Sequence, residues 1–357
     1  SGTHGKTTTT TLLAHTLLAA GKDPGFLIGG IPLGLEESFR TGATGAPFVV
    51  EGDEYDTAYF DKGPKFLHYR PRSLLLTSLE YDHADIYQSV EQIEARFAEV
   101  VALVPHDGHL VFCAEEPRLA AAAGHAQGGV RVDSYGEAGD WRAHDVEETA
   151  AGLAFHIAYR GVFKGALKVP LSGRHGVLNA LGAYAVLAGL GLTHDEIGAG
   201  FASFAGVKRR MEVVGERDGV VVLDDFAHHP TAVRTTLEGA RRRYEGRPLW
   251  ALFEPRSATS CRKVFQTDYA EAFDAADQVL LAPPGRQLDP SEALDVPQLA
   301  HDVTARGRPA IACESLDALV EQVARDAPVG AVLLCMSNGA FGGVHQRLLA
   351  ALEERRR

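Results

Sequence analysis

The glycine-rich string at the start of the chain constrains its fold most, because it requires a loop that leads directly into a helix. The string is Ser1-Gly2-Thr3-His4-Gly5-Lys6-Thr7-Thr8. Its glycines let backbone N–H groups surround phosphate oxygens, the lysine supplies a positive charge, and the Thr7 hydroxyl can bind Mg²⁺. Apolar residues then recur at helical spacing from Leu12 to Leu18, and Gly21 predicts the end of a helix. The string therefore predicts a phosphate-binding loop at a helix N-terminus, where the helix dipole adds positive charge.

The loop is a short form of this motif, with two residues between its glycines instead of the usual four. Such a loop also follows a strand, and no residues precede Ser1 to form one. We therefore expect the chain to be part of a larger protein, with the first strand of its first domain missing.

Apolar runs alternate with helical stretches along the chain, which is typical of parallel sheets with crossover helices. The 357 residues are enough for two domains with separate cores. The pattern predicts an α/β protein. We expect a first domain at 1–207 with a mostly parallel sheet and a small antiparallel β element, then a doubly wound, Rossmann-like α/β domain at 208–357. The expected elements are strands at 48–51, 73–79, 109–113, 220–223, 249–253, 278–281, 310–313 and 331–336, a hairpin within 152–171, and helices at 90–104 and 179–190.

Charge and composition exclude two classes of partner. The net charge of −12 argues against a surface that coats nucleic acid. No apolar run approaches the roughly 18 residues of a membrane span, so we expect no membrane partner. The four cysteines are far apart and lack the spacing of a metal site, and we interpret them as small buried residues of a cytoplasmic protein.

Two polar strings follow predicted strands of the first domain. Glu51-Gly52-Asp53-Glu54-Tyr55-Asp56 follows the first of these strands, and Asp82-His83 follows the next. Because open α/β sheets bind ligands at the carboxyl ends of their strands, we expect the four carboxylates of the first string to supply a Mg²⁺ ligand near a nucleotide. His83 could bind a second cation or orient a nucleophile. The alternatives are a solvated acidic loop for the first string and a helix cap or surface pair for the second.

One polar string of the second domain combines a carboxylate with two adjacent histidines. Asp225 follows the strand expected at 220–223, and His228 and His229 come just before Pro230. The carboxylate could accept a hydrogen bond from a ribose hydroxyl, and either histidine could donate to phosphate or polarise a carbonyl. The alternative is a turn with a helix cap, because proline is well suited to the first turn of a helix.

Two further strings end strands of the second domain. Arg256, in Glu254-Pro255-Arg256-Ser257, is suited to bidentate recognition of a carboxylate or phosphate. The turn that begins Asn338-Gly339 is rich in glycine, and its backbone N–H groups could bind a carboxylate. A tight turn chosen for backbone geometry explains the second string equally well.

Taken together, these strings resemble those of the Mur ligase family, the ATP-dependent amide ligases of peptidoglycan assembly. Gly173-Arg174-His175 with Asn179, and Lys208-Arg209-Arg210-Met211-Glu212, add to the resemblance, which covers essentially the whole chain. It implies three domains in the intact enzyme. The UDP-binding domain would be absent here, leaving the central P-loop ATPase domain and the C-terminal domain that receives the incoming peptide.

Within the family, the strings at 24–30, 60–69 and 254–257 are most similar to one branch. Its members join UDP-N-acetylmuramate to the murein tripeptide L-alanyl-γ-D-glutamyl-meso-diaminopimelate during peptidoglycan recycling. The resemblance implies that ATP phosphorylates the lactyl carboxylate of the sugar, and that the amine of the peptide attacks the resulting acyl phosphate. It leaves the oligomeric state open.

The resemblance also implies roles for single residues. Thr7 and Glu51 would hold one Mg²⁺, His83 would hold a second, and Lys6 would neutralise the phosphates. His175 and Asn179 would contact adenine, Asp225 the ribose, and Arg210 another part of the nucleotide. Arg256 would bind a phosphate or a peptide carboxylate. The remaining substrate contacts that the resemblance implies are Ser257, His228, His229, Asn338 and Gly339.

The chain departs from the family pattern at three places. Gly176 replaces a common asparagine after the histidine, Ser78 replaces an asparagine before Asp-His, and no lysine occurs between Ala84 and Val104. The last departure implies that a carbamylated lysine, which aids the second metal in some members, is absent.

Four alternative functions would also use several of these motifs, and each differs from the branch above in one feature. UDP-N-acetylmuramate–L-alanine ligase shares most of them, but we expect Pro-His-Arg after Phe253 in that enzyme, where this chain has Glu-Pro-Arg-Ser. Folylpolyglutamate synthase should lack the Asp-Glu-Tyr-Asp string. A nucleotide-binding regulatory module would have no need of the full Lys6, Glu51 and His83 set. A kinase that acts on a hydroxyl would form no amide and need no second cation.

Overall fold

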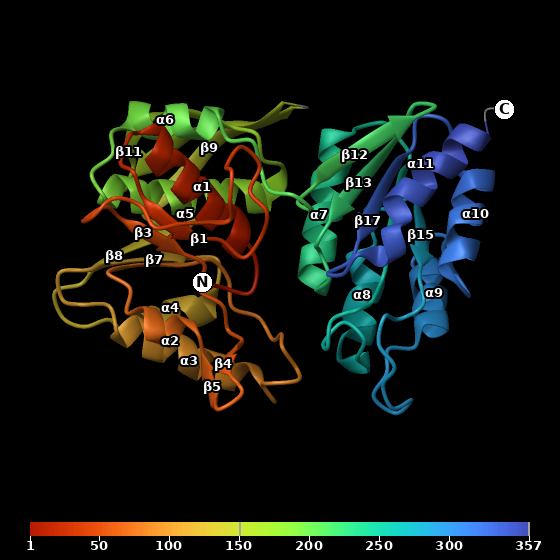
Figure 1. Cartoon of the computed structure of the whole chain (residues 1–357), viewed down its shortest axis with the longest axis horizontal. Coiled ribbons are helices and arrows are strands. Elements are labelled where there is room, and N and C mark those ends of the chain that lie inside the picture. Colours follow the sequence, from red (N-terminus) through yellow and green to blue (C-terminus); the bar gives the residue numbers. More distant parts are fainter. Residues whose placement is uncertain (150, 356–357) are drawn as a thin grey trace. The chain divides into compact units, whose positions relative to one another are not determined.

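The computed structural model describes residues 1–149 and 151–355 and divides into two compact units, Ser1–Val207 and Lys208–Arg357 (Figure 1). Each unit contains a six-stranded sheet with helices packed against it. The expected α/β class, with mostly parallel sheets and one small antiparallel element, is therefore confirmed.

The main sheet of the first unit has the order β11-β10-β9-β8-β7-β6. Strands β6 to β9 pair in parallel, whereas β9, β10 and β11 are antiparallel. The hairpin expected within 152–171 is confirmed, and Arg160 and Gly161 form its two-residue turn with φ values of 49° and 79°, as a right-twisted hairpin favours. The strands are β6 (Ser73–Leu76), β7 (His109–Cys113), β8 (Arg131–Tyr135), β9 (Trp141–Thr149), β10 (Gly152–Tyr159) and β11 (Val162–Val169).

Helices cover both faces of this sheet (Figure 1). Helix α5 (Gly173–Gly189) lies on one face with α1 (Lys6–Ala19) and α6 (His194–Ala202) packed against it, and α3 (Val90–Ala102) and α4 (Pro117–Ala123) lie on the other. The prediction that α5 begins at residue 179 was wrong by six residues. Its first turn holds two glycines, Arg174 and His175, and this turn lacks the apolar spacing that marks the rest of the helix.

Smaller elements surround the phosphate loop. The strand expected at 48–51 is confirmed as β3 (Phe48–Val50), but it pairs with β1 (Gly25–Leu27) in a separate three-stranded sheet that also includes β2 (Phe39–Arg40). The chain then forms a two-stranded ribbon, β4 (Asp56–Ala58) and β5 (Asp61–Pro64), and a short helix, α2 (Phe66–Tyr69).

The sheet of the second unit has the order β12-β13-β17-β14-β15-β16, and all its strands are parallel except the edge strand β12. Helices α7, α8 and α9 share one buried cluster with the sheet, and α10 and α11 share the cluster on its other face. The unit is therefore doubly wound, as expected. Its strands are β12 (Glu212–Arg217), β13 (Val220–Asp225), β14 (Leu249–Phe253), β15 (Gln278–Leu281), β16 (Ala310–Ala312) and β17 (Val332–Met336). Its helices are α7 (Pro230–Arg243), η1 (Lys263–Phe265), α8 (Gln266–Ala272), α9 (Val296–Ala305), α10 (Leu316–Asp326), η2 (Phe341–Gly343) and α11 (Val344–Glu354).

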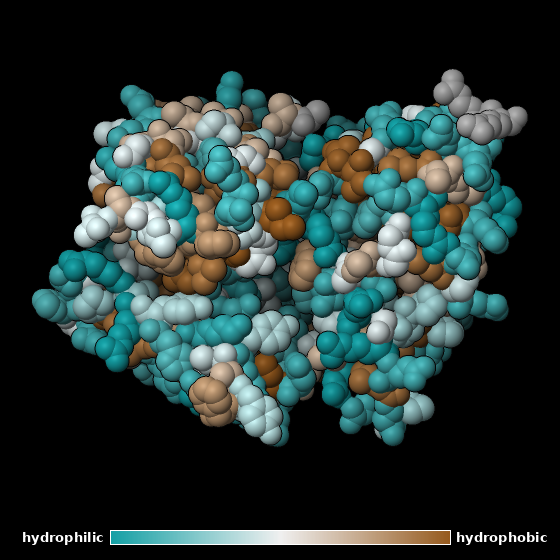
Figure 2. All heavy atoms as spheres, viewed as in Figure 1, coloured by the Kyte–Doolittle hydropathy of each residue, from teal (hydrophilic) through white to brown (hydrophobic). Residues whose placement is uncertain are grey.

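The surface of each unit is mainly polar on the face shown in Figure 2, where hydrophobic side chains lie in small, separate groups. Among the residues that the structure describes, no helix combines the length and the apolar character that a bilayer span requires. The four cysteines are buried and unpaired by disulfides, which agrees with their interpretation as small core residues.

Candidate nucleotide and metal site

The phosphate loop requires glycine at two positions. Gly5 immediately precedes α1 with a φ of 80°, and a Cβ atom there would overlap Oδ1 of Asn179. Gly2 has a φ of 142°, and a Cβ atom there would overlap Oγ1 of Thr77. Only glycine adopts both backbone conformations without strain and leaves room for these neighbours. Asn179, expected near adenine, is thus packed directly against the loop.

The loop is attached to the chain that follows β6. The backbone N–H of Thr3 donates to the carbonyl of Ser78 at 3.2 Å, and that of His4 donates to the Ser78 hydroxyl at 2.8 Å. The Thr77 hydroxyl donates to the carbonyl of His4 at 2.5 Å. These bonds hold the loop at the carboxyl end of β6, where a parallel sheet binds ligands. Ser78, noted above only as a departure from the family pattern, is one of the residues that anchor the loop.

Thr7 and Glu51, expected to share a metal ion, lie together. The Thr7 hydroxyl donates to Oε1 of Glu51 at 2.8 Å, and the backbone N–H of Gly29 donates to Oε2 at the same distance. Both oxygens of Glu51 therefore have partners. Because the threonine hydroxyl donates its proton to Glu51, the lone pairs of its oxygen stay available to a cation.

Glu54 is the carboxylate that faces the phosphate-loop lysine. Nζ of Lys6 donates to Oε2 of Glu54 at 2.7 Å, and the two side chains are only 12% and 3% exposed. The other oxygen, Oε1, is buried and accepts no hydrogen bond from the described residues. A buried acceptor without a partner is costly, and a cation would satisfy it. The sequence placed Glu54 in the acidic string, and the family resemblance singled out Glu51, because spacing alone does not show which carboxylate points toward Lys6.

Glu54 belongs to a set of residues able to bind a metal ion. Asp53, Glu54 and His83 each offer a ligand atom, and these atoms all lie within 4.8 Å of one another. Nε2 of His83 lies 4.0 Å from Oε2 of Glu54. Two carboxylates and an imidazole suit Mg²⁺ or Mn²⁺, so the residues present fit a divalent cation. His83, predicted to bind a second metal, is therefore close to a carboxylate partner that the prediction did not name.

The electrostatics of this cluster keep its lysine charged. Burial would lower the pKa of Lys6, but the carboxylates of Glu54, Asp53 and Glu51 outweigh this effect, and the pKa of Lys6 lies above its ordinary value. Burial raises the pKa values of Tyr55 and Tyr87 to about 12, so both hydroxyls keep their protons at neutral pH. The site thus offers a fixed cation next to carboxylates.

Helix α5 carries the other residues expected near the nucleotide. His175 lies in its first turn, and Asn179, one turn later, is buried against Gly5. A Cβ atom on Gly176 would lie 3.0 Å from Cβ of Leu171 and 3.1 Å from Cδ1 of Leu153, so the asparagine common in the family would not fit here without rearrangement. His4, in the loop itself, has Nε2 at 3.3 Å from Oε2 of Glu80. The adenine contact stays a prediction.

In the second unit, the three polar strings gather at one edge of the sheet. Asp225, Phe253 and Met336 end neighbouring strands and lie in register, so the loops that follow them are adjacent. Both oxygens of Asp225 accept backbone N–H bonds at 2.8 Å, from Met211 and Ala227, and burial raises its pKa. The carboxylate that was expected at a ribose thus joins its own loop to the segment that contains Met211, and the ribose contact stays a prediction.

Arg256 lies between two glycines at this edge. A Cβ atom on Gly339 would overlap the Arg256 side chain, and one on Gly285 would lie 2.8 Å from its Cγ. Its NH1 atom is 3.6 Å from Oε1 of Glu254, and the side chain is 44% exposed. The guanidinium is therefore accessible to an anion. Two other expected substrate contacts lie in the same loops. The Ser257 hydroxyl is buried and accepts a hydrogen bond from the backbone N–H of Ser260. Oδ1 of Asn338 is buried and has no hydrogen-bond partner among the described residues.

The two adjacent histidines have different surroundings. His229 is the N-cap of α7, where Nδ1 accepts from the backbone N–H of Thr231 at 3.3 Å, so the helix-cap alternative is confirmed for this residue. Nδ1 of His228 lies 3.0 Å from the carbonyl of Phe226. Arg210 stacks over the Phe226 ring at 5.2 Å. Contacts of these side chains with substrate or nucleotide stay predictions.

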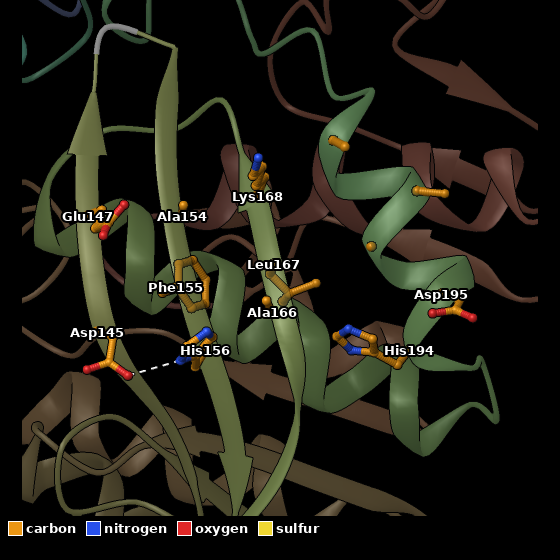
Figure 3. Close-up of a pocket in the computed structure, with 13 residues that line it drawn as sticks. Asp145, Glu147, Ala154, Phe155, His156, Ala166, Leu167, Lys168, His194 and Asp195 are labelled. Carbon is orange, nitrogen blue, oxygen red and sulfur yellow. Dashed lines mark hydrogen bonds and ion pairs between the residues drawn. The ribbon is translucent and has the colours of Figure 1, made fainter.

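A separate pocket of about 550 Å³ lies in the first unit between α6 and the antiparallel strands (Figure 3). Asp145, His156, Lys168 and His194 line it, and His156 pairs with Asp145 at 2.9 Å. None of the predicted site residues lines this pocket.

Comparison with known proteins gives matches along nearly the whole chain. The family model described as Mur ligase middle domain matches residues 1–187, and the model described as Mur ligase, glutamate ligase domain, matches residues 209–339. The UDP-N-acetylmuramate–L-alanyl-γ-D-glutamyl-meso-2,6-diaminoheptandioate ligase of Escherichia coli is 37% identical over 99% of this chain and 75% of its own length. A UDP-N-acetylmuramate–L-alanine ligase of Caldanaerobacter subterraneus is 31% identical over 98% of this chain and 74% of its length.

A solved structure agrees with these matches. The murein peptide ligase of Psychrobacter arcticus superimposes with a TM-score of 0.70 at 34% identity and covers 99% of this chain and 76% of its own. The family models and the relatives both extend across the two units, and they include the phosphate loop and the polar strings described above. The chain therefore belongs to the Mur ligase family.

Proposed function

We propose that this chain is the ATP- and peptide-binding part of a ligase that joins UDP-N-acetylmuramate to L-alanyl-γ-D-glutamyl-meso-diaminopimelate. The observation that carries the proposal is the buried cluster in which Lys6 of the phosphate loop pairs with Glu54, beside His83. We assign ATP binding to residues 1–207 and peptide binding to residues 208–357. The 37% identity to the E. coli ligase and the Glu254-Pro255-Arg256-Ser257 string support the tripeptide as substrate.

Lys6 supplies the fixed positive charge that phosphoryl transfer between two anions requires. In this proposal Thr7 and Glu51 would hold one Mg²⁺, and Asp53, Glu54 and His83 would hold a second. When bound, the cations would neutralise charge on the ATP phosphates and on the sugar carboxylate. Each oxygen of Glu51 accepts one hydrogen bond, from Thr7 or from Gly29, and keeps a lone pair for a cation.

The proposed reaction has two steps. ATP transfers its γ-phosphoryl group to the lactyl carboxylate of the sugar, which gives an acyl phosphate and ADP. The free amine of the tripeptide attacks the acyl carbon, and phosphate leaves as the amide forms. Arg256 is exposed between Gly285 and Gly339, and we assign it to a carboxylate of the peptide.

The test is an ADP-release assay on the complete enzyme. We expect release that depends on both UDP-N-acetylmuramate and tripeptide, and Lys6→Ala should lower kcat at least 100-fold. Lys22→Ala is a matched control, because Lys22 is 43% exposed and pairs with Glu196 at 3.6 Å outside the site. A strong preference for L-alanine would favour the L-alanine ligase instead. ATP binding without substrate-dependent turnover would favour a regulatory module.

A further inference from the structure

The two residues proposed as metal ligands lie in irregular segments of the chain. Neither Glu54 nor His83 belongs to a helix or a strand, so no ladder of backbone hydrogen bonds fixes their separation. His83 also has a φ of 55°, which is unfavourable for a residue other than glycine. Their 4.0 Å approach therefore depends on contacts outside regular secondary structure, among them the 2.7 Å bond from Lys6 to Glu54.

Two tyrosines make these contacts in a reciprocal way. Tyr55 follows Glu54 in the chain, and its ring contacts the His83 ring with centroids 4.1 Å apart and planes tilted by 58°. Tyr87 lies four residues after His83, and its buried hydroxyl donates to the backbone carbonyl of Glu54 at 2.8 Å. Each tyrosine thus belongs to the segment of one ligand and contacts the other ligand.

The backbone around His83 links the second contact to the imidazole. The carbonyl of His83 accepts hydrogen bonds from the N–H groups of Ile86 and Tyr87, at 2.8 and 2.9 Å. These bonds form a turn that sets the direction of both the His83 and the Tyr87 side chains. A movement of either segment therefore disturbs both tyrosine contacts together.

We propose that Tyr55 and Tyr87 are positioning residues that hold Glu54 and His83 at the separation a divalent cation requires. This inference rests on the proposed function, because it takes Glu54 and His83 as the metal-binding pair. Groups that orient metal ligands typically change metal affinity 10-fold to 100-fold when they are removed. We call Tyr55 and Tyr87 the brace, and removing either contact should change metal affinity more than it changes the fold.

The test measures Mn²⁺ binding to the complete enzyme by electron paramagnetic resonance, together with the KM for Mg²⁺ and kcat. We expect Tyr87→Phe and Tyr55→Leu each to weaken Mn²⁺ binding about 10-fold and to raise the KM for Mg²⁺ more than they lower kcat. Tyr55→Phe, which keeps the ring, should bind Mn²⁺ more tightly than Tyr55→Leu. Tyr135→Phe is the matched control, because this buried hydroxyl donates to the Leu76 carbonyl at 3.3 Å outside the cluster, and Mn²⁺ affinity should stay the same.

The outcomes separate the brace from the function on which it rests. Unchanged Mn²⁺ affinity in Tyr87→Phe and Tyr55→Leu, with wild-type binding intact, would overturn the brace alone. A wild-type enzyme that binds no Mn²⁺, or a His83→Ala variant that binds it as well as wild type, would overturn the proposed metal site and the brace together.

Discussion

The buried carboxylate of Asp133 makes the stability of the first unit depend on pH. It accepts hydrogen bonds from Nε2 of His109 and the hydroxyl of Tyr159, both at 2.9 Å, and pairs with Arg131 at 2.6 Å. Burial alone would raise the pKa of Asp133, but these partners outweigh it and lower the pKa from 3.8 to about 2. The folded state therefore binds the proton more weakly than the unfolded state does.

The sign and size of the effect follow from this difference. Because the pKa of Asp133 is depressed on folding, the contribution is fully present above pH 4 and is lost as the pH falls from about 4 to about 2. The difference between 3.8 and about 2 corresponds to about 2.5 kcal/mol of unfolding free energy. For a unit of this size we expect Asp133→Asn to lower the melting temperature at pH 7 by about 5–10 °C.

The assay is chemical denaturation of the wild type and Asp133→Asn at several pH values from 7 down to 2. The stability difference between them should be largest at pH 7 and shrink below pH 4. Asp145→Asn is the control, because the His156–Asp145 pair has the same 2.9 Å separation but is exposed, and it should change stability little. A difference between wild type and Asp133→Asn that stays constant from pH 7 to pH 2 would refute the reasoning.

Three other substitutions test the site and its supports. Gly5→Ala should destabilise the first unit by about 1–2 kcal/mol and weaken ATP binding, because φ is 80° and a Cβ would overlap Asn179. Thermal melting would measure the loss of stability, and calorimetric titration would measure the loss of ATP affinity. Glu54→Gln should abolish Mn²⁺ binding and destabilise the protein by about 3 kcal/mol, since it leaves Lys6 buried without its partner; an equally stable variant in urea would contradict this. His229→Ala should cost about 1 kcal/mol through loss of the α7 cap, measured by denaturation, and unchanged stability would show that the cap contributes nothing.

Much of the fold was predictable because the buried strands are uninterrupted apolar runs. The strands at 109–113, 249–253 and 278–281 match the expected bounds. The helix after the phosphate loop and the hairpin at Arg160-Gly161 also follow from local signals, which are helical spacing in one case and two β-rich runs on either side of Arg160-Gly161 in the other. Pairing was harder to predict, since strand 48–50 joins a small sheet beside β1 and not the main sheet.

The candidate site was predictable in its location but not in its contacts. Carboxylates after one strand and an imidazole after another indicated where a cation would bind. The family resemblance implied that Thr7 and Glu51 lie together, as they do. The sequence does not show that Glu54 turns toward Lys6, because Glu54 lies in an irregular segment whose path depends on tertiary packing. The contacts of Tyr55 and Tyr87 could not be predicted from the sequence for the same reason.

The attachment of the phosphate loop to the end of β6 has a consequence for how the site tolerates insertions. Thr77 and Ser78 hold the loop, and His83 follows only five residues after Ser78. This short stretch limits how far the His83 imidazole can lie from the loop. Lengthening or shortening it by one residue would keep every side chain named above, yet it should move the imidazole away from Glu54.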